Sequence, residues 1–297
     1  MGYWKRKVVY ALFRLYRIRG GLDRAFDTGE FGRQEVRTPP TRTRSSLQWD
    51  TKKVEGRDVF VLKPSDQHTS RGTILYLHGG AYVFGFHDTH WRFLETLVQE
   101  TGYTVVAPDY PLAPEQTFRD AYAMVKPLCQ ALSADESGGE LILMGDSAGG
   151  GFALALAQEM HRESMVQAGK IILMCPWLDL TLDNPEIASI ASEDPILTVS
   201  GLRRAGQAYA GGTDPSHRLL SPINGGIEDL GKISILIGSM DLLVADARRL
   251  KRMAEEQKVP LRYMEFADRV HNWMFFPLPG AREAVRQVVA IINETNH

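Results

Sequence analysis

One stretch of the chain, LILMGDSAGGGFALALAQEM at residues 141–160, constrains the fold more than any other. It begins as a short, continuous apolar run, which is typical of a strand buried on both faces, and ends in residues that favour helix. Ser147 lies between the two, with Gly145 and Gly149 two residues to either side. So tight a connection forces its central residue into strained backbone angles, and side chains at the flanking positions would collide. The stretch therefore predicts a strand, a sharp turn at the serine, and a helix.

This arrangement predicts a nucleophile. G-x-S-x-G between a strand and a helix is the nucleophile elbow of α/β-hydrolases, which lifts a serine hydroxyl above the sheet and directs a helix N-terminus at it. The same pattern can arise by chance in a Gly-rich loop, and this chain has 27 glycines. The prediction therefore needs a base, an acid and backbone donors elsewhere in the chain.

The rest of the chain alternates between predicted strands and helices. We predict strands at 58–62, 73–77, 104–107, 141–144, 171–174, 234–237 and 262–266, and helices at 91–101, 118–132, 152–160, 244–257 and 281–293. Such alternation implies an α/β fold whose sheet is mostly parallel and covered by helices on both faces. The fold class we predict is an α/β-hydrolase fold with an eight-stranded sheet and a small helical cap.

Two segments are expected to lie outside the sheet. Residues 1–50 form a predicted N-terminal cap segment, joined through the connector VRTPPTRTRSS at 36–46 to a catalytic domain at 51–297. The polar, Pro-containing passage at 180–230 is expected to contribute to the same cap. Apolar residues recur at helical spacing near the N-terminus, at Val9, Leu12, Phe13 and Tyr16. We expect that helix to fold over its own protein rather than to lie on a membrane surface.

Composition excludes several partners. The net charge of −2 gives no reason to expect nucleic acid, and no apolar run approaches the length of a membrane span. The N-terminus lacks the apolar core and cleavage site of a secretory signal. Cys129 and Cys175 have no metal-ligand spacing and are interpreted as structural thiols in a reducing compartment. We therefore expect a cytoplasmic protein that can form a homodimer, and we do not expect the N-terminal helix to contact lipid.

A serine hydroxyl needs a base, and histidine suits that role near neutral pH. Of the eight histidines, His271 lies five residues beyond the last predicted strand, where catalytic groups gather in such sheets. His78 ends a strand but begins HGGAY, for which another use is expected. His87 and His90 in FHDTH give only weak support for a metal site, so we expect no metal.

The base in turn needs a carboxylate to orient it. Asp241 closes the predicted penultimate strand, and the chain order Ser147, Asp241, His271 is the order that α/β-hydrolases use. Asp246 and Asp268 are the alternatives, and either can be an ordinary solvated charge. We therefore predict Asp241 as the acid.

Acyl transfer also needs backbone N–H groups that face the developing oxyanion. Gly79 and Gly80 directly follow a predicted strand, and their lack of side chains lets a substrate approach the backbone closely. A Gly-Gly turn without function is the alternative interpretation. Ala148, at the start of the elbow helix, is expected to supply the remaining donor.

Seven motifs together resemble the hormone-sensitive-lipase family of bacterial esterases (family IV). They are HGGAY, DYPLAPE, GDSAGG, PWLDL, SEDPILT, GGTDPSHRLLSP and DLLVAD, and the resemblance spans residues 58–292. It implies an α/β-hydrolase fold without a cofactor and the hydrolysis of esters with small or medium acyl chains. It also implies Ser147, Asp241 and His271 as the triad, and Ala81 as an oxyanion donor together with Gly79, Gly80 and Ala148. His78 would brace the oxyanion loop by hydrogen bonding.

The sequence departs from the family pattern at four places. Ala81 replaces the fourth glycine of the oxyanion loop, and Leu242 replaces the proline after the acid. Asn272-Trp273 replaces Gly-Phe after the base, and Pro111 replaces the arginine of the YRLAPE motif. The ring of Trp273 beside the base puts the shape of the pocket in doubt.

The resulting prediction is a serine carboxylesterase that acts on a small-molecule ester through an acyl-enzyme. Four aromatic residues near the catalytic elements are candidates for the wall of an apolar pocket, with core packing as the alternative: Tyr82, Phe84, Trp177 and Trp273. The same nucleophile also serves lactonases, amidases, peptidases and dehydratases, and a non-catalytic ligand-binding protein can share the scaffold.

Overall fold

The structure, a computed structural model, describes residues 19–31, 35–65, 70–135 and 138–294. The described residues form an eight-stranded sheet in the order β1-β2-β4-β3-β5-β6-β7-β8. Its strands are β1 (Gln48–Val54), β2 (Arg57–Lys63), β3 (Gly72–Leu77), β4 (Thr104–Pro108), β5 (Glu140–Asp146), β6 (Lys170–Met174), β7 (Lys232–Gly238) and β8 (Leu261–Phe266). Pairing is antiparallel from β1 through β2 to β4 and parallel across the rest. The predicted mostly parallel sheet is confirmed.

Burial explains which strands the sequence reveals. Every residue of β4 and β6 is buried, and continuous apolar runs are typical of strands covered on both faces. The edge strand β1 was not predicted. Its sequence, QWDTKKV, is largely polar and alternates between exposed and half-buried positions, because this edge of the sheet faces solvent.

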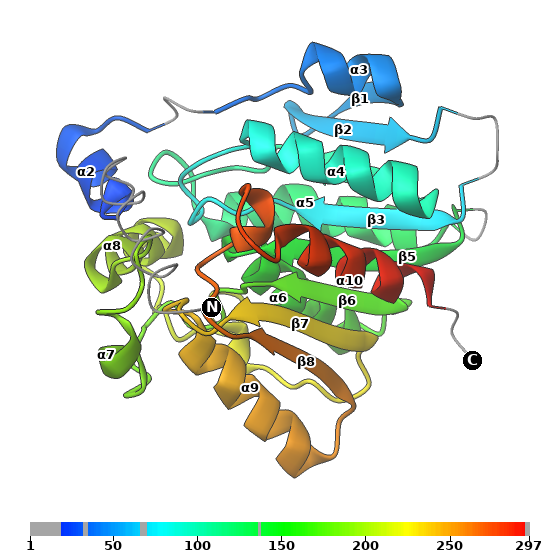
Figure 1. Cartoon of the computed structure of the whole chain (residues 1–297). Helices are drawn as coiled ribbons and strands as arrows, with labels where there is room; N and C mark the ends of the chain where they lie inside the picture. The colour runs from blue at the N-terminus through cyan, green and yellow to red at the C-terminus, as the bar shows by residue number, and fades with distance from the viewer. Residues whose placement is uncertain (1–18, 32–34, 66–69, 136–137, 295–297) are drawn as a thin grey trace.

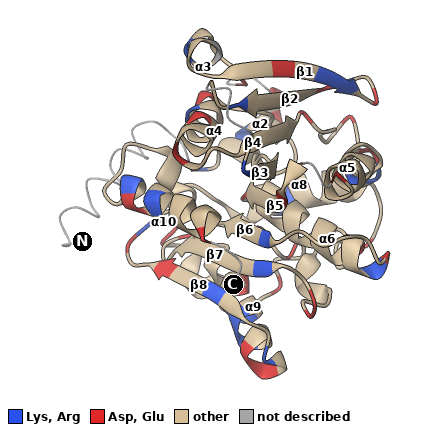
Figure 2. Ribbon diagram, turned by 90° about the vertical axis from the view of Figure 1, so that its right-hand side faces the viewer, with Lys and Arg blue, Asp and Glu red and all other residues tan. Residues whose placement is uncertain are grey.

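Helices cover both faces of the sheet. They are α4 (Asp88–Thr101), α5 (Phe118–Ser133), α6 (Ala148–Arg162), α9 (Val244–Gln257) and α10 (Ala281–Asn293). Figure 1 shows α4 and α10 together in front of the sheet, with α5 and α6 behind it. In Figure 2 the ribbon positions of basic and of acidic residues are spread over many elements, in keeping with the small net charge.

A second group of helices lies beyond the carboxyl ends of the parallel strands (Figure 1). These are α2 (Gly21–Thr28), α7 (Ile187–Ile190) and α8 (Val199–Ala210). Helix α2 packs against α8: Thr198 donates to Asp23 at 2.5 Å, and Arg204 donates to Asp27 at 2.6 Å while lying over the ring of Phe26. The N-terminal segment and the 180–230 passage are thus in contact.

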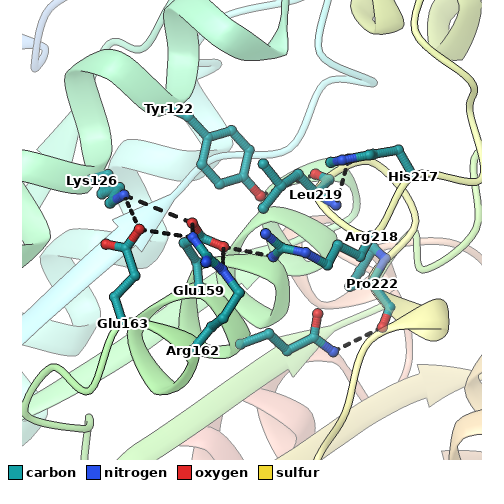
Figure 3. Close-up of polar contacts among 10 residues, drawn as sticks. Tyr122, Lys126, Glu159, Arg162, Glu163, His217, Arg218, Leu219 and Pro222 are labelled. Carbon is teal, nitrogen blue, oxygen red and sulfur yellow. Dashed lines mark hydrogen bonds and ion pairs between the residues drawn. The ribbon is translucent and has the colours of Figure 1, made fainter.

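Charged side chains join the end of this passage to the helices behind the sheet (Figure 3). Glu159 of α6 is buried and accepts hydrogen bonds from Arg218 and Arg162, each at 2.6 Å. Lys126 of α5 donates to Glu163 at 2.6 Å. We call these five residues the α6 charge cluster. Since Arg218 belongs to the 180–230 passage, the cluster ties that passage to the elbow helix.

Three segments differ from the sequence prediction. The elbow helix begins at Ala148 rather than at residue 152, because three glycines in its first turn conceal its helical character. Part of the predicted connector forms the short helix α3 (Thr41–Ser46), and the 180–230 passage contains α7, α8 and the 3₁₀ turn η2 (Pro222–Asn224). The predicted amphipathic helix at 9–16 lies outside the described residues. Within the described ranges no helix is long and apolar enough to cross a membrane.

Candidate active site

Ser147 forms the whole connection between β5 and α6. Its backbone angles, φ 53° and ψ −121°, lie where side chains are rarely tolerated. A Cβ on Gly145 would lie 2.2 Å from the carbonyl oxygen of Gly149, and a Cβ on Gly149 would lie 2.0 Å from that of Leu77. Glycine is therefore required on both sides of the turn, for the steric reason that the sequence indicates.

Three side chains from separate strand ends meet at this serine. Ser147 Oγ lies 2.9 Å from His271 Nε2, and His271 Nδ1 lies 2.8 Å from Asp241 Oδ2. A carboxylate only accepts, so Nδ1–H donates to Asp241 and Nε2 remains to accept the serine hydroxyl proton. The arrangement has the geometry of a nucleophile, a base and an orienting acid.

Two opposing effects determine the pKa of His271. Burial of the ring is the largest single effect and lowers the pKa. The charge and hydrogen bond of Asp241, together with the charges of Asp194 and Asp146, raise it by more in total, so the pKa of His271 lies above its ordinary value of 6.5. Asp241 is fully buried, and its other oxygen accepts from the Leu243 N–H at 2.9 Å. The carboxylate is thus held in place to stabilise an imidazolium.

The other candidate acids make different contacts. Asp246 lies in α9 and accepts from Asn184 Nδ2 at 2.8 Å. Asp268 lies in the turn after β8, where its backbone N–H donates to Ser239 Oγ. The imidazole contact is made by Asp241, so the geometry favours the predicted acid.

The loop after β3 brings backbone N–H groups to the same end of the sheet. Gly80 has φ 117° and its carbonyl accepts from the N–H of Phe84 at 2.9 Å, which closes a tight turn. Gly79 N–H donates to Asp146 Oδ1 at 2.8 Å and is therefore engaged within the protein. Within the described part of the chain we find no protein acceptor for the N–H groups of the other predicted donors: Gly80, Ala81 and Ala148.

His78 contacts the loop as the family resemblance implies. A carbonyl only accepts, so His78 Nδ1 donates to Gly79 O at 2.7 Å. The ring stacks on Tyr110, whose hydroxyl donates to the His78 carbonyl at 2.6 Å. Burial lowers the pKa of His78 to about 3, so the ring is neutral at physiological pH.

Asp146, directly before the nucleophile, was not singled out from the sequence. Its Oδ1 accepts from Tyr76 OH at 2.6 Å and from Gly79 N–H, and its Oδ2 accepts from Asn272 Nδ2 at 2.8 Å. His90 Nε2 lies 3.5 Å from the same Oδ2. Burial alone would raise the pKa of Asp146, but His90 and the hydrogen bonds lower it to about 2. An acid at the last position of a buried strand is the signal that the sequence offered.

Asp194 was also not assigned a role, although it lies in the quoted motif SEDPILT. Its Oδ1 accepts from the N–H groups of Ile196 and Leu197 at 2.7 and 2.9 Å. Its Oδ2 accepts at 2.8 Å from the N–H of Leu242, the residue after Asp241. Burial, followed by the charge of Asp241, raises the pKa of Asp194 to about 6. A carboxylate from the segment before α8 thus contacts the loop that carries Asp241.

The four predicted pocket residues occupy different environments. Trp177 and Trp273 are fully buried, Tyr82 is buried and stacks on Tyr209 of α8 at 3.8 Å, and Phe84 is half-buried. A pocket of about 250 Å³ is lined by other residues: Phe31, Glu35, Arg37, Arg57, Val83, Leu112, Glu115 and Gln116. The role of the four aromatic residues in binding substrate stays a prediction.

A comparison with protein families identifies the fold, and the matched range includes the site. A family model described as an alpha/beta hydrolase fold matches residues 74–275. The chain belongs to the alpha/beta hydrolase fold family. The predicted fold class is therefore confirmed, and all three residues of the hydrogen-bonded chain at Ser147 lie within the matched range.

Two relatives of this α/β-hydrolase are named as an acetyl-hydrolase and an esterase. An acetyl-hydrolase of Streptomyces hygroscopicus is 31% identical over 226 residues, which are 74% of this chain and 75% of the relative. An esterase of Acinetobacter venetianus is 28% identical over 228 residues, 75% of each chain.

Solved structures agree on the fold. An esterase/lipase from an uncultured bacterium has a TM-score of 0.81 at 24% identity, and an esterase of the bacterial hormone-sensitive lipase family has a TM-score of 0.78 at 24% identity. In each case 98% of both chains is covered. At this level of identity, both likenesses show that this chain shares the fold of these esterases.

Proposed function

We propose that this α/β-hydrolase is a serine carboxylesterase that hydrolyses short- to medium-chain acyl esters through an acyl-enzyme. The observation that carries the proposal is the continuous hydrogen-bonded chain from Ser147 Oγ through His271 to Asp241. The broader class, a carboxylic ester hydrolase, agrees with the names of its relatives.

The chemistry follows from the geometry. Ser147 Oγ attacks the ester carbonyl carbon while His271 Nε2 takes the hydroxyl proton, and Asp241 stabilises the imidazolium. The oxyanion is met by the backbone N–H groups of Gly80 and Ala81 in the loop after β3, and of Ala148 at the positive end of α6. His271 then protonates the departing alcohol, which leaves an acyl-serine. Water deprotonated by His271 attacks the carbonyl carbon of the acyl-serine. The bond to Ser147 Oγ then breaks, His271 returns the proton to Oγ, and the carboxylic acid leaves.

Small acyl groups are favoured because the catalytic residues are almost completely enclosed by the protein. Only 5% of Ser147 and 6% of His271 are exposed, and the helices α2 and α8 lie at this end of the sheet. We propose that residues 1–50 and 180–230 form the cap, and that Tyr82, Phe84, Trp177 and Trp273 border the space beneath it. We also propose that the protein is cytoplasmic and that it can form a homodimer.

Labelling with a fluorophosphonate tests the nucleophile. We expect one label per chain in the wild type and none in Ser147→Ala, while Ser133→Ala, a matched change on α5 away from the site, labels fully. An unlabelled wild type contradicts the serine mechanism.

A substrate panel tests the reaction class. We expect nitrophenyl acetate and butyrate to be turned over faster than nitrophenyl esters of long acyl chains. Lactones and amides in the same panel separate the alternatives, because the same triad serves them. Fastest turnover of a long-chain ester, a lactone or an amide would contradict the proposed substrate class.

A further inference from the structure

Asn272, the residue after His271, makes a contact that the mechanism above does not use. Its Nδ2 donates to Oδ2 of Asp146 at 2.8 Å, and Asp146 is the residue before the nucleophile. We infer that this contact, here called the Asn272–Asp146 tether, makes Asn272 a positioning residue that keeps the His271 imidazole aligned with the Ser147 hydroxyl. The inference rests on the serine mechanism proposed above.

The backbone at Asn272 restricts which residues fit. Its φ of 49° and ψ of 32° are left-handed, a conformation in which glycine, asparagine and aspartate are tolerated best. The backbone N–H is directed at Cys175 Sγ, 3.4 Å away. Glycine, which the family resemblance expects here, preserves this backbone and lacks the amide. Asparagine is thus the choice that keeps the turn and adds one side-chain donor.

The other end of the tether is rigid. Asp146 is fully buried, and its second oxygen is fixed by Tyr76 OH and Gly79 N–H. Asn272 Oδ1, by contrast, has no hydrogen-bond partner among the residues that the structure describes. The amide is therefore anchored through its nitrogen alone, so its removal breaks one defined contact.

The topology explains why such an anchor affects the base. His271 lies in a loop after β8, whereas Ser147 lies in the turn after β5, and their hydrogen bond depends on how these two loops are placed. The tether joins the residue beside each of them, and the same carboxylate holds Gly79 of the oxyanion loop. A misplacement of about 1 Å between reacting groups can cost about a hundredfold in rate.

Asn272→Gly isolates the amide. We expect kcat for nitrophenyl acetate to fall about tenfold with KM nearly unchanged, because the lost alignment affects proton transfer rather than substrate binding. Lys258→Gly is the matched control for the backbone effect, since Lys258 is exposed, has φ 57° and ends α9. It is expected to leave kcat unchanged. An Asn272→Gly enzyme with wild-type kcat overturns the inference.

Asn272→Asp gives a readout that a purely structural role would not. Two carboxylates at this distance hold one proton between them at low pH and repel once it is lost. We expect the kcat of Asn272→Asp to be close to that of the wild type at the same low pH, where protonation of His271 slows both, and to fall below it as pH rises. The ratio of Asn272→Gly to wild type is expected to stay constant with pH. The ionisable groups facing the pair are Tyr76 from β3, His78 from the loop after β3, His90 from α4, Tyr110 from the loop after β4, Cys175 after β6, Asp241 after β7 and His271 after β8. Parallel pH profiles for all three proteins overturn the inference.

A measurement without turnover separates this inference from the proposed function. A wild type that hydrolyses no ester refutes the proposed function, and the tether is then tested by the NMR titration of the His271 imidazole. The added negative charge in Asn272→Asp is expected to raise the pKa of His271 by about half a unit once the shared proton is lost. An unchanged pKa of His271 in that variant counts against the tether, whatever the activity.

Discussion

At the scale of single residues, His271 determines how hydrolysis depends on pH. The base must be neutral to accept the serine proton, and the Asp241 carboxylate holds the pKa of His271 above 6.5 despite burial. We expect kcat/KM for nitrophenyl acetate to rise with pH through a pKa above 6.5 and then to level off. A rising limb centred below pH 6 would contradict this. By the same shift, protonated His271 stabilises the fold below pH 6.5, and that contribution is lost as pH rises through the folded-state pKa.

Asp241→Asn removes the charge and the acceptor that orient the imidazole. We expect kcat to fall about 10⁴-fold, because the ring loses its productive tautomer. The rising limb of kcat/KM is expected to move to lower pH, since the carboxylate no longer raises the pKa of His271. Stopped assays across pH 5–9 measure both effects, and residual activity within tenfold of the wild type would contradict the assignment of the acid.

The triad positions were accessible from sequence because each follows a predicted strand in a fixed order. Ser147, Asp241 and His271 could be named from motif and spacing alone. The tether could not, because it joins residues 126 positions apart through the direction of two side chains. Departure from the family pattern at Asn272 was visible, but the partner of its amide was not. Gly79 is a second example. It was predicted as an oxyanion donor, but its N–H donates to Asp146, a contact that the sequence did not indicate.

At the scale of secondary-structure elements, the segment before α8 is coupled to the loop after β7 through Asp194. Its carboxylate accepts from the Leu242 N–H, and its charge adds to that of Asp241 in raising the pKa of His271. Asp194→Asn is expected to move the rising limb of kcat/KM to lower pH, because it removes a negative charge that helps to raise the pKa of His271. Activity profiles across pH 5–9 measure this shift.

Asp246→Asn is the matched control for that experiment. Asp246 is also fully buried, and burial also raises its pKa to about 6, but its side chain contacts Asn184 rather than the loop of the acid. We expect this variant to leave the rising limb of kcat/KM where it lies in the wild type. If both variants moved it equally, the effect of Asp194 would not be specific to the acid loop.

Elements were predictable where burial is complete and obscure where it is partial. The inner strands appear in the sequence as apolar runs because helices cover both of their faces. The strand β1 and the helices α2, α7 and α8 carry mixed composition, since one side of each packs against the protein while another faces solvent. Their presence depends on tertiary contacts, which local pattern does not contain.

At the scale of the whole molecule, the α6 charge cluster fastens the 180–230 passage to the sheet layer (Figure 3). The hydrogen bonds that Glu159 accepts from Arg162 and Arg218 lower the pKa of Glu159 from 4.5 to about 2. A depressed carboxyl pKa stabilises the fold above pH 4.5, and this contribution is lost as pH falls through 2. Glu159→Gln is therefore expected to cost about 1–3 kcal/mol at pH 7 and progressively less toward pH 2.

Urea unfolding at several pH values tests that expectation. Glu283→Gln serves as the control, because Glu283 pairs with Arg286 on the exposed side of α10 and holds no second segment. Its unfolding free energy should stay close to that of the wild type. A Glu159→Gln deficit that is equal at pH 7 and pH 3 would show that the ionic contacts contribute nothing to the stability of the fold.

The positive φ of Ser147 costs the fold stability, while the same residue is required for the proposed reaction. Glycine adopts such angles freely, and relief of this strain amounts to about 1–3 kcal/mol before the greater freedom of glycine in the unfolded chain is deducted. Ser147→Gly is therefore expected to melt about 3 °C above the wild type while hydrolysing no ester, as scanning calorimetry and an ester assay would show. A lower melting temperature would contradict this. Selection of variants for heat tolerance alone would therefore favour inactive proteins. Any such screen on this scaffold must also require ester hydrolysis at every round.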